Sequence, residues 1–324
     1  MTCDATCDTT CDTAGETTDG TTGAATDDAT PSALSGASSG ARSGVRPVRK
    51  RALVFDSGVG GLSVLDAIVD AGGALDLDYA ADNAWLPYGA KSDAALCDRV
   101  PRLIAALVRD WAPGAVVIAC NTASTIALDA VRAVVGVPVV GVVPPIKPAA
   151  ALTRTGVIGV LATPATVSRP YTDDLIAKFA ADRRVIRFGS TALVGAAEAR
   201  LAGHDINPAA IAEAIEGLFA APGGDQLDVV ALACTHFPLL AAELAAAAPR
   251  PIAWLDSGAA IAARLLAVLD LEPGQAAPRL RRAGFTGNGA AVWEAFQARG
   301  FTSRATIGAA PSFVVAPAPD ERYG

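Results

Sequence analysis

The sequence lacks the features of membrane and nucleic-acid-binding proteins. No apolar run reaches the roughly 18 residues of a membrane-spanning helix, since the strongest, "VVGVPVVGVVPP", is short and contains prolines. No apolar segment follows a basic start at the N-terminus, which argues against a secretory signal. The formal net charge is −7, so net basicity does not favour nucleic acid or anionic lipid. We therefore expect a cytoplasmic protein with neither a membrane nor a nucleic acid as partner.

Motifs for metals and nucleotide cofactors are also missing. The chain has two histidines and no C-x-x-C, which indicates neither a zinc site nor a redox disulfide. The stretch "DSGVGG" at 56–61 is not G-x-G-x-x-G, and no dinucleotide fingerprint is present. We expect no metal and no organic cofactor. Without a secretory signal, the six cysteines are expected to be reduced thiols.

The first 45 residues contain almost no large apolar side chains and are rich in Thr, Ser, Gly, Ala and Asp. Such a segment cannot bury enough surface to offset the entropy of ordering it. It opens with the repeat "TCDA TCDT TCDT", but no histidine accompanies Cys3, Cys7 and Cys11 to suggest a metal site. We predict that residues 1–51 are a disordered acidic tail and basic linker. An upstream start assigned in error would give the same composition.

From residue 52 onward, strand-like and helical patterns alternate. The strand-like runs are 52–55, 75–82, 115–119, 138–142, 156–162, 184–188 and 229–233. Amphipathic helical stretches include 61–71, 92–110, 123–134, 168–180, 208–220 and 238–248, and a further helical piece lies within 254–271. This alternation predicts an α/β protein with parallel strands and helices on both faces of the sheet.

The chain can be divided into two halves that overlay. Each has a Gly- or Thr-rich loop after its first strand, and each has an apolar strand that ends in Ala-Cys, at Cys120 and Cys234. We predict two similar doubly wound parallel-sheet domains related by a pseudo-twofold, with the active site in the cleft between them. The predicted domains are 52–145, completed by 254–316, and 146–253, with residues 317–324 as a tail.

The two cysteines occur in matching contexts, "VVIACNTAST" at 116–125 and "VVALACTHFP" at 229–238. In open α/β sheets, ligands bind beyond the C-terminal ends of the strands, so both thiols are expected to face one cleft. A hydroxyl residue and a helix follow each cysteine; Asn121 or Thr122 is the expected cap of the first helix, and Pro238 suits the first turn of the second. Helix N-termini lower the pKa of a thiol, which predicts that both cysteines are more acidic than free cysteine.

Several kinds of chemistry are compatible with a thiol at a strand end. A lone buried cysteine is often only a small apolar residue. A disulfide or a zinc site is not supported by the spacing, and a single nucleophile leaves the second thiol without a role. The remaining option uses both thiols: one thiolate removes a proton from a carbon, and the other thiol returns one on the opposite face. The pair therefore predicts racemisation or epimerisation by two chemically similar bases.

Asp56 ends the first strand in "VFDSGVGGLS". It could assist proton transfer at the first thiol or hold a substrate ammonium group, or it could be an ordinary helix cap. Glycines 58, 60 and 61 could let backbone N–H groups approach a substrate carboxylate at the helix start. The sequence alone leaves these interpretations open.

His236 follows Cys234 by two positions and could assist that thiol, or it could be a surface residue in a turn. In "DNAWLPYGAKS", the Tyr88 O–H and the Gly89 N–H could hold a carboxylate, or they could belong to an ordinary turn. Cys97 lies in a helical pattern and is expected to be part of the core.

Seven motifs, in order, resemble those of glutamate racemases of the proteobacterial kind: "VFDSGVGGLSVL", "DNAWLPYGAKS", "ACNTAST", "GVVPPIKPAA", "LATPATVSRPYT", "AEARLAG" and "CTHFPLL". The resemblance extends from about Ala52 to about Phe301. It implies a cofactor-independent isomerase with two pseudo-symmetric α/β domains. Such an enzyme interconverts L- and D-glutamate for peptidoglycan, and hence for cell-wall biogenesis and cell shape. It implies glutamate as the small-molecule partner and allows a homodimer.

The resemblance also assigns roles to residues. Cys120 and Cys234 match the acid/base pair, and Asp56 and His236 match the residues that assist them. The implied substrate contacts are Asp56, Ser57, Tyr88, Gly89, Asn121, Thr122, Thr235 and His236, with Glu198, Thr163 and Thr166 as further candidates. Two alternatives stay open: a related two-cysteine racemase acting on aspartate or another small acid, and a non-catalytic regulatory protein that binds gyrase. The acidic N-terminal segment and the residues after Phe301 do not match the family pattern.

Overall fold

The computed structural model describes residues 48–308, and within them two separate sheets are formed, each of parallel strands. Residues 1–47 of the predicted disordered segment, with Cys3, Cys7 and Cys11, lie outside the described residues, as do 309–316 of the predicted first domain and the tail at 317–324. The predicted linker end at residue 51 is wrong, because Lys50 and Arg51 begin strand β1 (Lys50–Asp56) and pair with β2 (Leu75–Ala81). Among the described residues, no helix is both long and apolar enough to cross a membrane.

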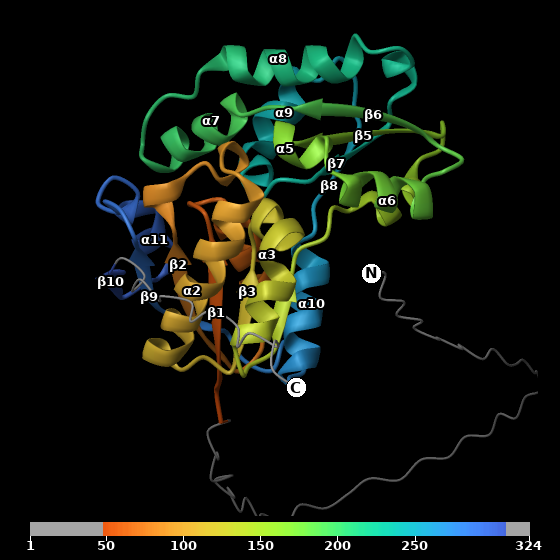
Figure 1. Ribbon diagram of the computed structural model, residues 1–324. Coiled ribbons are helices and arrows are strands. Elements are labelled where there is room, and N and C mark those ends of the chain that lie inside the picture. Colours follow the sequence, from red (N-terminus) through yellow and green to blue (C-terminus); the bar gives the residue numbers. More distant parts are fainter. Residues whose placement is uncertain (1–47, 309–324) are drawn as a thin grey trace, which may run out of the picture. The chain divides into compact units, whose positions relative to one another are not determined.

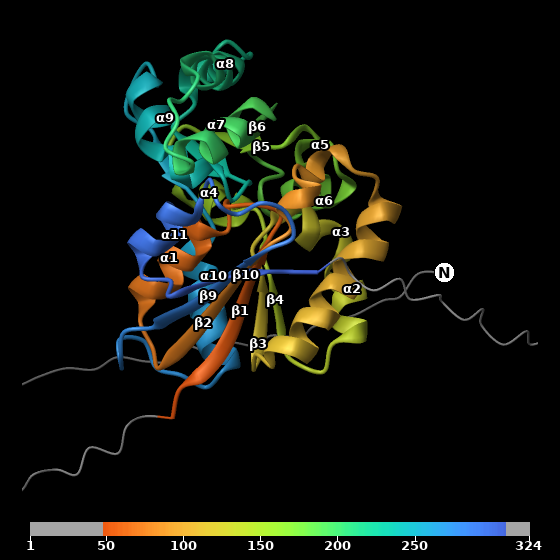
Figure 2. The same ribbon diagram turned by 90° about the vertical axis from the view of Figure 1, so that its left-hand side faces the viewer.

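The larger sheet has six strands in the order β10-β9-β2-β1-β3-β4. Its strands are β1 (Lys50–Asp56), β2 (Leu75–Ala81), β3 (Ala115–Ile118), β4 (Val139–Gly141), β9 (Arg279–Phe285) and β10 (Ser303–Thr306). Helices α1 (Leu62–Ala71), α10 (Gly258–Val268) and α11 (Trp293–Arg299) cover one face, and α2 (Asp93–Trp111) and α3 (Asn121–Val134) cover the other (Figure 2). We call this sheet with its helices the first lobe.

The smaller sheet has four strands in the order β6-β5-β7-β8. They are β5 (Val157–Ala162), β6 (Arg184–Gly189), β7 (Val229–Leu232) and β8 (Ala253–Leu255). Helices α7 (Ala192–Leu201), α8 (Pro208–Phe219) and α9 (Ala241–Ala247) pack on one face; α4 (Ile146–Leu152) and α6 (Pro170–Phe179) pack on the other (Figure 1). Between β5 and α6 lies α5 (Pro164–Val167). We call this sheet with its helices the second lobe.

Burial on both faces explains why the strands were recognisable. In β1, Ala52 and Val54 pack into the core under α1 and α10, while Leu53 and Phe55 pack into the core under α2 and α3. A strand covered on both sides has a nearly continuous apolar run in place of strict alternation. The seven predicted strands are all present, which confirms the predicted α/β fold with parallel sheets.

The two lobes share a strand order. The order β2-β1-β3-β4 in the first lobe corresponds to β6-β5-β7-β8 in the second, and β9 and β10 extend the first sheet beyond β2. The chain passes to the second lobe after β4 and returns after β8, where the Ser257 hydroxyl donates a hydrogen bond to the Val143 carbonyl (2.6 Å). Strand β8 contains the predicted domain boundary at 253/254 and pairs with β7.

One expectation about the core is wrong. Cys97 lies on α2 as the pattern predicted, but its side chain is exposed. Its neighbours Leu96 and Val100 are the buried residues on this stretch of α2. The thiol lies one position beyond Leu96, and in a helix of 3.6 residues per turn that places it off the apolar stripe.

Candidate active site

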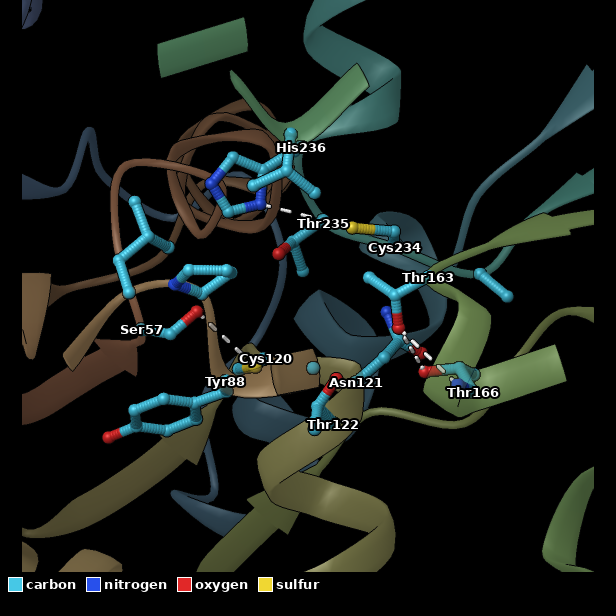
Figure 3. A pocket seen from close by; sticks show the side chains of 15 residues that line it. Ser57, Tyr88, Cys120, Asn121, Thr122, Thr163, Thr166, Cys234, Thr235 and His236 are labelled. Carbon is cyan, nitrogen blue, oxygen red and sulfur yellow. Dashed lines mark hydrogen bonds between the residues drawn. The ribbon is translucent and has the colours of Figure 1, made fainter. Parts of the chain in front are cut away.

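Residues from both lobes line one cavity at the C-terminal ends of their strands (Figure 3). The first lobe contributes the segments after β1 and β3 and the turn at 86–89; the second contributes the segments after β5 and β7. The lining residues are Ser57, Leu86, Pro87, Tyr88, Gly89, Cys120, Asn121, Thr122, Thr163, Thr166, Val194, Ala233, Cys234, Thr235 and His236. Most candidates from the sequence are thus brought together; Asp56 and Glu198 lie behind this lining.

Both cysteines lie at strand ends and face the same cavity. Cys120 is the N-cap residue of α3, following β3, and Cys234 follows β7 at the corresponding place in the second lobe. Each residue is 6% exposed, so each thiol is largely shielded from solvent but reaches the cavity. Figure 3 shows Cys120 on the side of the first lobe and Cys234 on the side of the second.

The expected acidity of both thiols is wrong for Cys120. Burial, together with the charge of the nearby Asp56 carboxylate, raises its pKa to about 12; the Ala123 N–H and the Ser57 hydroxyl oppose this only in part. The Cys120 Sγ lies 3.6 Å from the Ser57 Oγ. Desolvation of a thiolate therefore outweighs the favourable field of the helix start. Helix α3 begins at Asn121, so Cys120, rather than Asn121 or Thr122, is its capping residue.

Asp56 connects the two lobes beneath the cavity. Its carboxylate is fully buried and accepts hydrogen bonds from the Gly58 N–H (2.8 Å) and from the Thr235 hydroxyl (3.0 Å). Burial raises the pKa of this carboxyl, although the charge of His236 and the two hydrogen bonds oppose the shift. Asp56 is therefore placed to act on Cys120 through its charge and on the Cys234 segment through Thr235.

His236 is buried, which rules out a surface residue. Its Nδ1 lies 3.9 Å from the Cys234 Sγ, and its Nε2 lies 2.8 Å from the Glu198 Oε1. Burial alone would lower the pKa of His236, but its contacts with Cys234 and Glu198 raise that pKa well above its usual value. The imidazole is therefore held as a cation, with the sulfur on one side and a carboxylate on the other.

Glu198 and the glycine-rich loop join across the lobes. Glu198, on α7, also accepts a hydrogen bond from the Val59 N–H (2.9 Å). A Cβ atom at Gly58 would lie 2.2 Å from the Glu198 Oε1, and one at Gly60 would lie 2.4 Å from the His236 Nδ1. The glycines at 58 and 60 therefore allow Glu198 and His236 to approach the loop, and the approach of glycine N–H groups to a substrate carboxylate stays a prediction.

The Tyr88 hydroxyl is directed away from the cavity, against expectation. It donates a hydrogen bond to the buried Asp82 carboxylate (2.6 Å), which also forms an ion pair with Arg99 (2.7 Å). Gly89 lines the cavity and faces Thr163. At this turn, only the backbone N–H groups of Tyr88 and Gly89 are left to meet a carboxylate.

The remaining candidates are small polar side chains around the cavity. Asn121 is 5% exposed, and among the described residues its Oδ1 has no hydrogen-bond partner. The hydroxyls of Thr163 and Thr166 lie 3.0 Å apart at the start of α5. An orphaned buried acceptor is costly unless a ligand satisfies it. The Asn121 Oδ1 therefore marks a place where a ligand can donate a hydrogen bond.

The sequence reasoning missed four lining residues. Leu86, Pro87 and Ala233 lie inside quoted motifs, "DNAWLPYGAKS" and "VVALACTHFP", so their place beside the candidates Tyr88 and Cys234 was the available signal. Val194 comes from α7, one turn before the candidate Glu198, and as an apolar side chain it gave no signal of its own. Within residues 48–308, no group of three or more His, Cys, Asp or Glu is placed to hold a metal ion.

Comparison with known proteins gives consistent matches. The model of the Asp/Glu/Hydantoin racemase family matches residues 60–265. The glutamate racemase of Sphingopyxis alaskensis is 53% identical over 228 residues, 70% of this chain and 84% of that protein. The glutamate racemase of Pectobacterium carotovorum subsp. carotovorum is 48% identical over 261 residues, 79% of this chain and 91% of that protein.

Solved structures show the same similarity. Escherichia coli glutamate racemase, in complex with L-glutamate and the activator UDP-MurNAc-Ala, superposes with a TM-score of 0.73 and 40% identity, covering 81% of this chain and 99% of that one. Thermus thermophilus glutamate racemase, in complex with β-chloro-D-alanine, superposes with a TM-score of 0.62 and 29% identity, covering 80% and 97%. The resemblance seen in the sequence motifs is thereby confirmed. With the family model matching more than half of its residues, the chain belongs to the Asp/Glu/Hydantoin racemase family.

Proposed function

We propose that this protein interconverts L- and D-glutamate by a two-base mechanism that needs no cofactor. The observation that carries the proposal is the placement of Cys120 and Cys234, which end corresponding strands of two lobes and line one cavity. Proteins that are about half identical to this chain over most of its length are named glutamate racemases. In each direction, one thiolate takes the Cα proton and the other thiol protonates the opposite face.

The charges around the two sulfurs differ. The His236 imidazole, whose pKa is raised well above its usual value, has its Nδ1 3.9 Å from the Cys234 Sγ. Burial and the Asp56 carboxylate raise the pKa of Cys120, which keeps the proton on that sulfur. Cys120 is therefore ready to donate a proton, and His236 is placed to assist proton transfer at Cys234.

The small polar groups of the cavity would hold the substrate. The Asn121 Oδ1 can accept a hydrogen bond from the substrate ammonium group. The backbone N–H groups of Tyr88 and Gly89, the hydroxyls of Ser57 and Thr122, and one hydroxyl of the Thr163–Thr166 pair can donate to the two carboxylates, whereas the Thr235 hydroxyl already donates to Asp56. Donors fixed in a shielded site stabilise the charge that develops as Cα is deprotonated.

We also infer the setting of this reaction. D-Glutamate would supply peptidoglycan synthesis in the cytoplasm, and the chain would act as two domains, 52–145 with 254–316 and 146–253. A homodimer is compatible with this arrangement. The inference rests on the family and on the two sheets, and size measurement in solution would test the dimer.

The proposal is tested by measuring racemisation of L-glutamate, D-glutamate and aspartate by circular dichroism for the wild type, Cys120→Ser and Cys234→Ser. We expect the wild type to racemise glutamate and not aspartate. Each serine variant should lose about 10³-fold or more in kcat, because a serine hydroxyl is a far weaker acid and base than a thiol.

A matched control is Cys97→Ser, since this cysteine is exposed on α2 and outside the cavity lining. It should keep wild-type rates. Racemisation that survives in both cavity variants would exclude the two-thiol mechanism. Preference for aspartate would instead support a related racemase, and no turnover of any amino acid would support a non-catalytic protein.

A further inference from the structure

The segment that carries Cys234 contains a carbonyl group, that of Thr235, for which its own turn provides no hydrogen-bond donor. Thr235 is buried, and the turn η4 (Phe237–Leu240) follows it. The N–H of Phe237 bonds to the Cys234 oxygen (3.1 Å), and the N–H of Leu239 bonds to the His236 oxygen (3.2 Å). Between these two, the donor for the Thr235 oxygen would be residue 238, a proline without an N–H.

Ser63, on α1 of the first lobe, supplies the missing donor. Its Oγ lies 2.8 Å from the Thr235 oxygen and 2.9 Å from the Gly60 oxygen. A serine hydroxyl has one proton to donate, and the Gly60 oxygen already accepts the backbone N–H of Ser63 (3.1 Å). Among residues 48–308, Ser63 makes the only hydrogen bond to the Thr235 oxygen, so we assign its proton there.

This bond acts on the second thiol and not on the first. The Thr235 carbonyl belongs to the peptide between Thr235 and His236, directly after Cys234. Ser63 lines a second, smaller cavity together with Cys234 and Thr235, and it does not line the cavity that both thiols share. It therefore touches the segment that carries Cys234 and His236 without meeting the substrate.

We propose that Ser63 is a positioning residue for Cys234, holding the segment of the second thiol in place for proton transfer from the other lobe. This inference rests on the proposed racemase function. Loss of the Ser63 hydroxyl should slow proton transfer at Cys234 and not at Cys120. A displacement of reacting groups by about 1 Å can cost about 100-fold in rate, so we expect kcat of Ser63→Ala to fall by roughly 10- to 100-fold.

Deuterium isotope effects in the two directions distinguish positioning from general damage. With Cα-deuterated L- and D-glutamate, slowing the Cys234 step raises the isotope effect in the direction where Cys234 removes the deuteron. It lowers the isotope effect in the opposite direction. There Cys120 removes the deuteron, and this removal becomes reversible because the following protonation by Cys234 is slow. Ser63→Ala should therefore change the two isotope effects unequally, in the same sense as Cys234→Ser and opposite to Cys120→Ser.

Three further variants serve as controls. Ser63→Thr keeps the hydroxyl and should retain near-wild-type kinetics. The double variant Ser63→Ala/Pro238→Ala places an N–H three residues after Thr235 and should recover part of kcat and of the isotope-effect symmetry. Ser303→Ala removes an exposed serine far along the chain, on β10, and should change nothing.

The outcomes distinguish a failure of the proposed function from a failure of the proposed role of Ser63. A wild type that does not racemise glutamate would overturn the proposed function and, with it, this inference. A racemising wild type whose Ser63→Ala variant has unchanged kcat, or equal isotope-effect changes in both directions, would overturn the role of Ser63 alone. If Ser63→Ala does not fold, the double variant carries the same test, because a residual loss of kcat with equal isotope-effect changes in the two directions contradicts the proposal.

Discussion

At the residue scale, the chemistry of each thiol is determined by groups from distant parts of the chain. Asp56 raises the pKa of Cys120 from a strand 64 positions earlier, and Glu198 holds His236 charged beside Cys234. The motifs were enough to predict the cysteine pair and its neighbours. The direction of the Cys120 pKa shift was not predictable, because burial and the Asp56 carboxylate follow from tertiary packing.

Glu198→Gln tests the charge on His236. Removing the carboxylate should lower the pKa of His236, which histidine ring signals in NMR can follow, with exposed His204 as the only other ring in the chain. The racemisation rate should fall because the cation beside Cys234 is lost. Glu243→Gln, which breaks a surface pair with Arg200, is the matched control and should leave both unchanged.

The same shift predicts how stability depends on pH. A histidine whose pKa is raised by folding adds stability that is complete below its unfolded pKa of about 6.5 and is lost as pH rises through the higher folded pKa. In Glu198→Gln, where the folded pKa is lower, this loss should be smaller and should end at lower pH than in the wild type. Denaturant unfolding at a series of pH values measures the difference, and coincident pH profiles would contradict a charged His236.

At the element scale, strands with an apolar run were predictable, and the arginine-rich strands at the edge of the first sheet were not. The run "AVVI" of β3 is wholly buried and apolar. By contrast, "RLRRAGF" of β9 and "SRAT" of β10 are rich in arginine and partly exposed, so their sequences lack the apolar run that indicates a strand. The pairing of β9 with β2, and of β10 with β9, is shown only by the folded chain.

The loop between β1 and α1 gives a prediction at this scale. Gly60→Ala would place a methyl group 2.4 Å from the His236 Nδ1 and 2.6 Å from the Thr235 Oγ1. We expect the variant to lose about 1–3 kcal/mol of unfolding free energy and most of its activity, because the two lobes must separate locally. Thermal unfolding and racemisation assays measure both.

Gly136→Ala is the matched control for that substitution, since a Cβ atom at this position would have no atom within 4 Å and the φ of Gly136 is not in the left-handed region. It should change the unfolding free energy by less than about 1 kcal/mol, with full activity. Equal behaviour of the two alanine variants would show that the approach of His236 to Gly60 is not limiting.

At the scale of the whole molecule, the two-lobed arrangement was predictable because the chain repeats its own pattern. Cys120 and Cys234 occupy equivalent strand ends in sheets of corresponding order, and this repetition is visible in the sequence. The contacts that join the lobes were not predictable from the sequence. Bonds from Thr235 to Asp56, from Val59 to Glu198 and from Ser63 to Thr235 connect residues 139 to 179 positions apart.

These contacts make the site a property of both lobes together. Each lobe supplies one sulfur, and the first lobe also binds the segment that carries the sulfur of the second. An arrangement of this kind predicts that the two thiols approach the substrate from opposite sides, which is what inversion at Cα requires.

The most direct test of that claim is exchange of the Cα proton with deuterated water in the two serine variants. Each variant keeps one thiol, so Cys120→Ser and Cys234→Ser should each retain residual exchange of one enantiomer of glutamate, and the two should favour opposite enantiomers. NMR of the Cα proton measures this. Exchange of the same enantiomer by both variants would contradict proton transfer from two opposite faces.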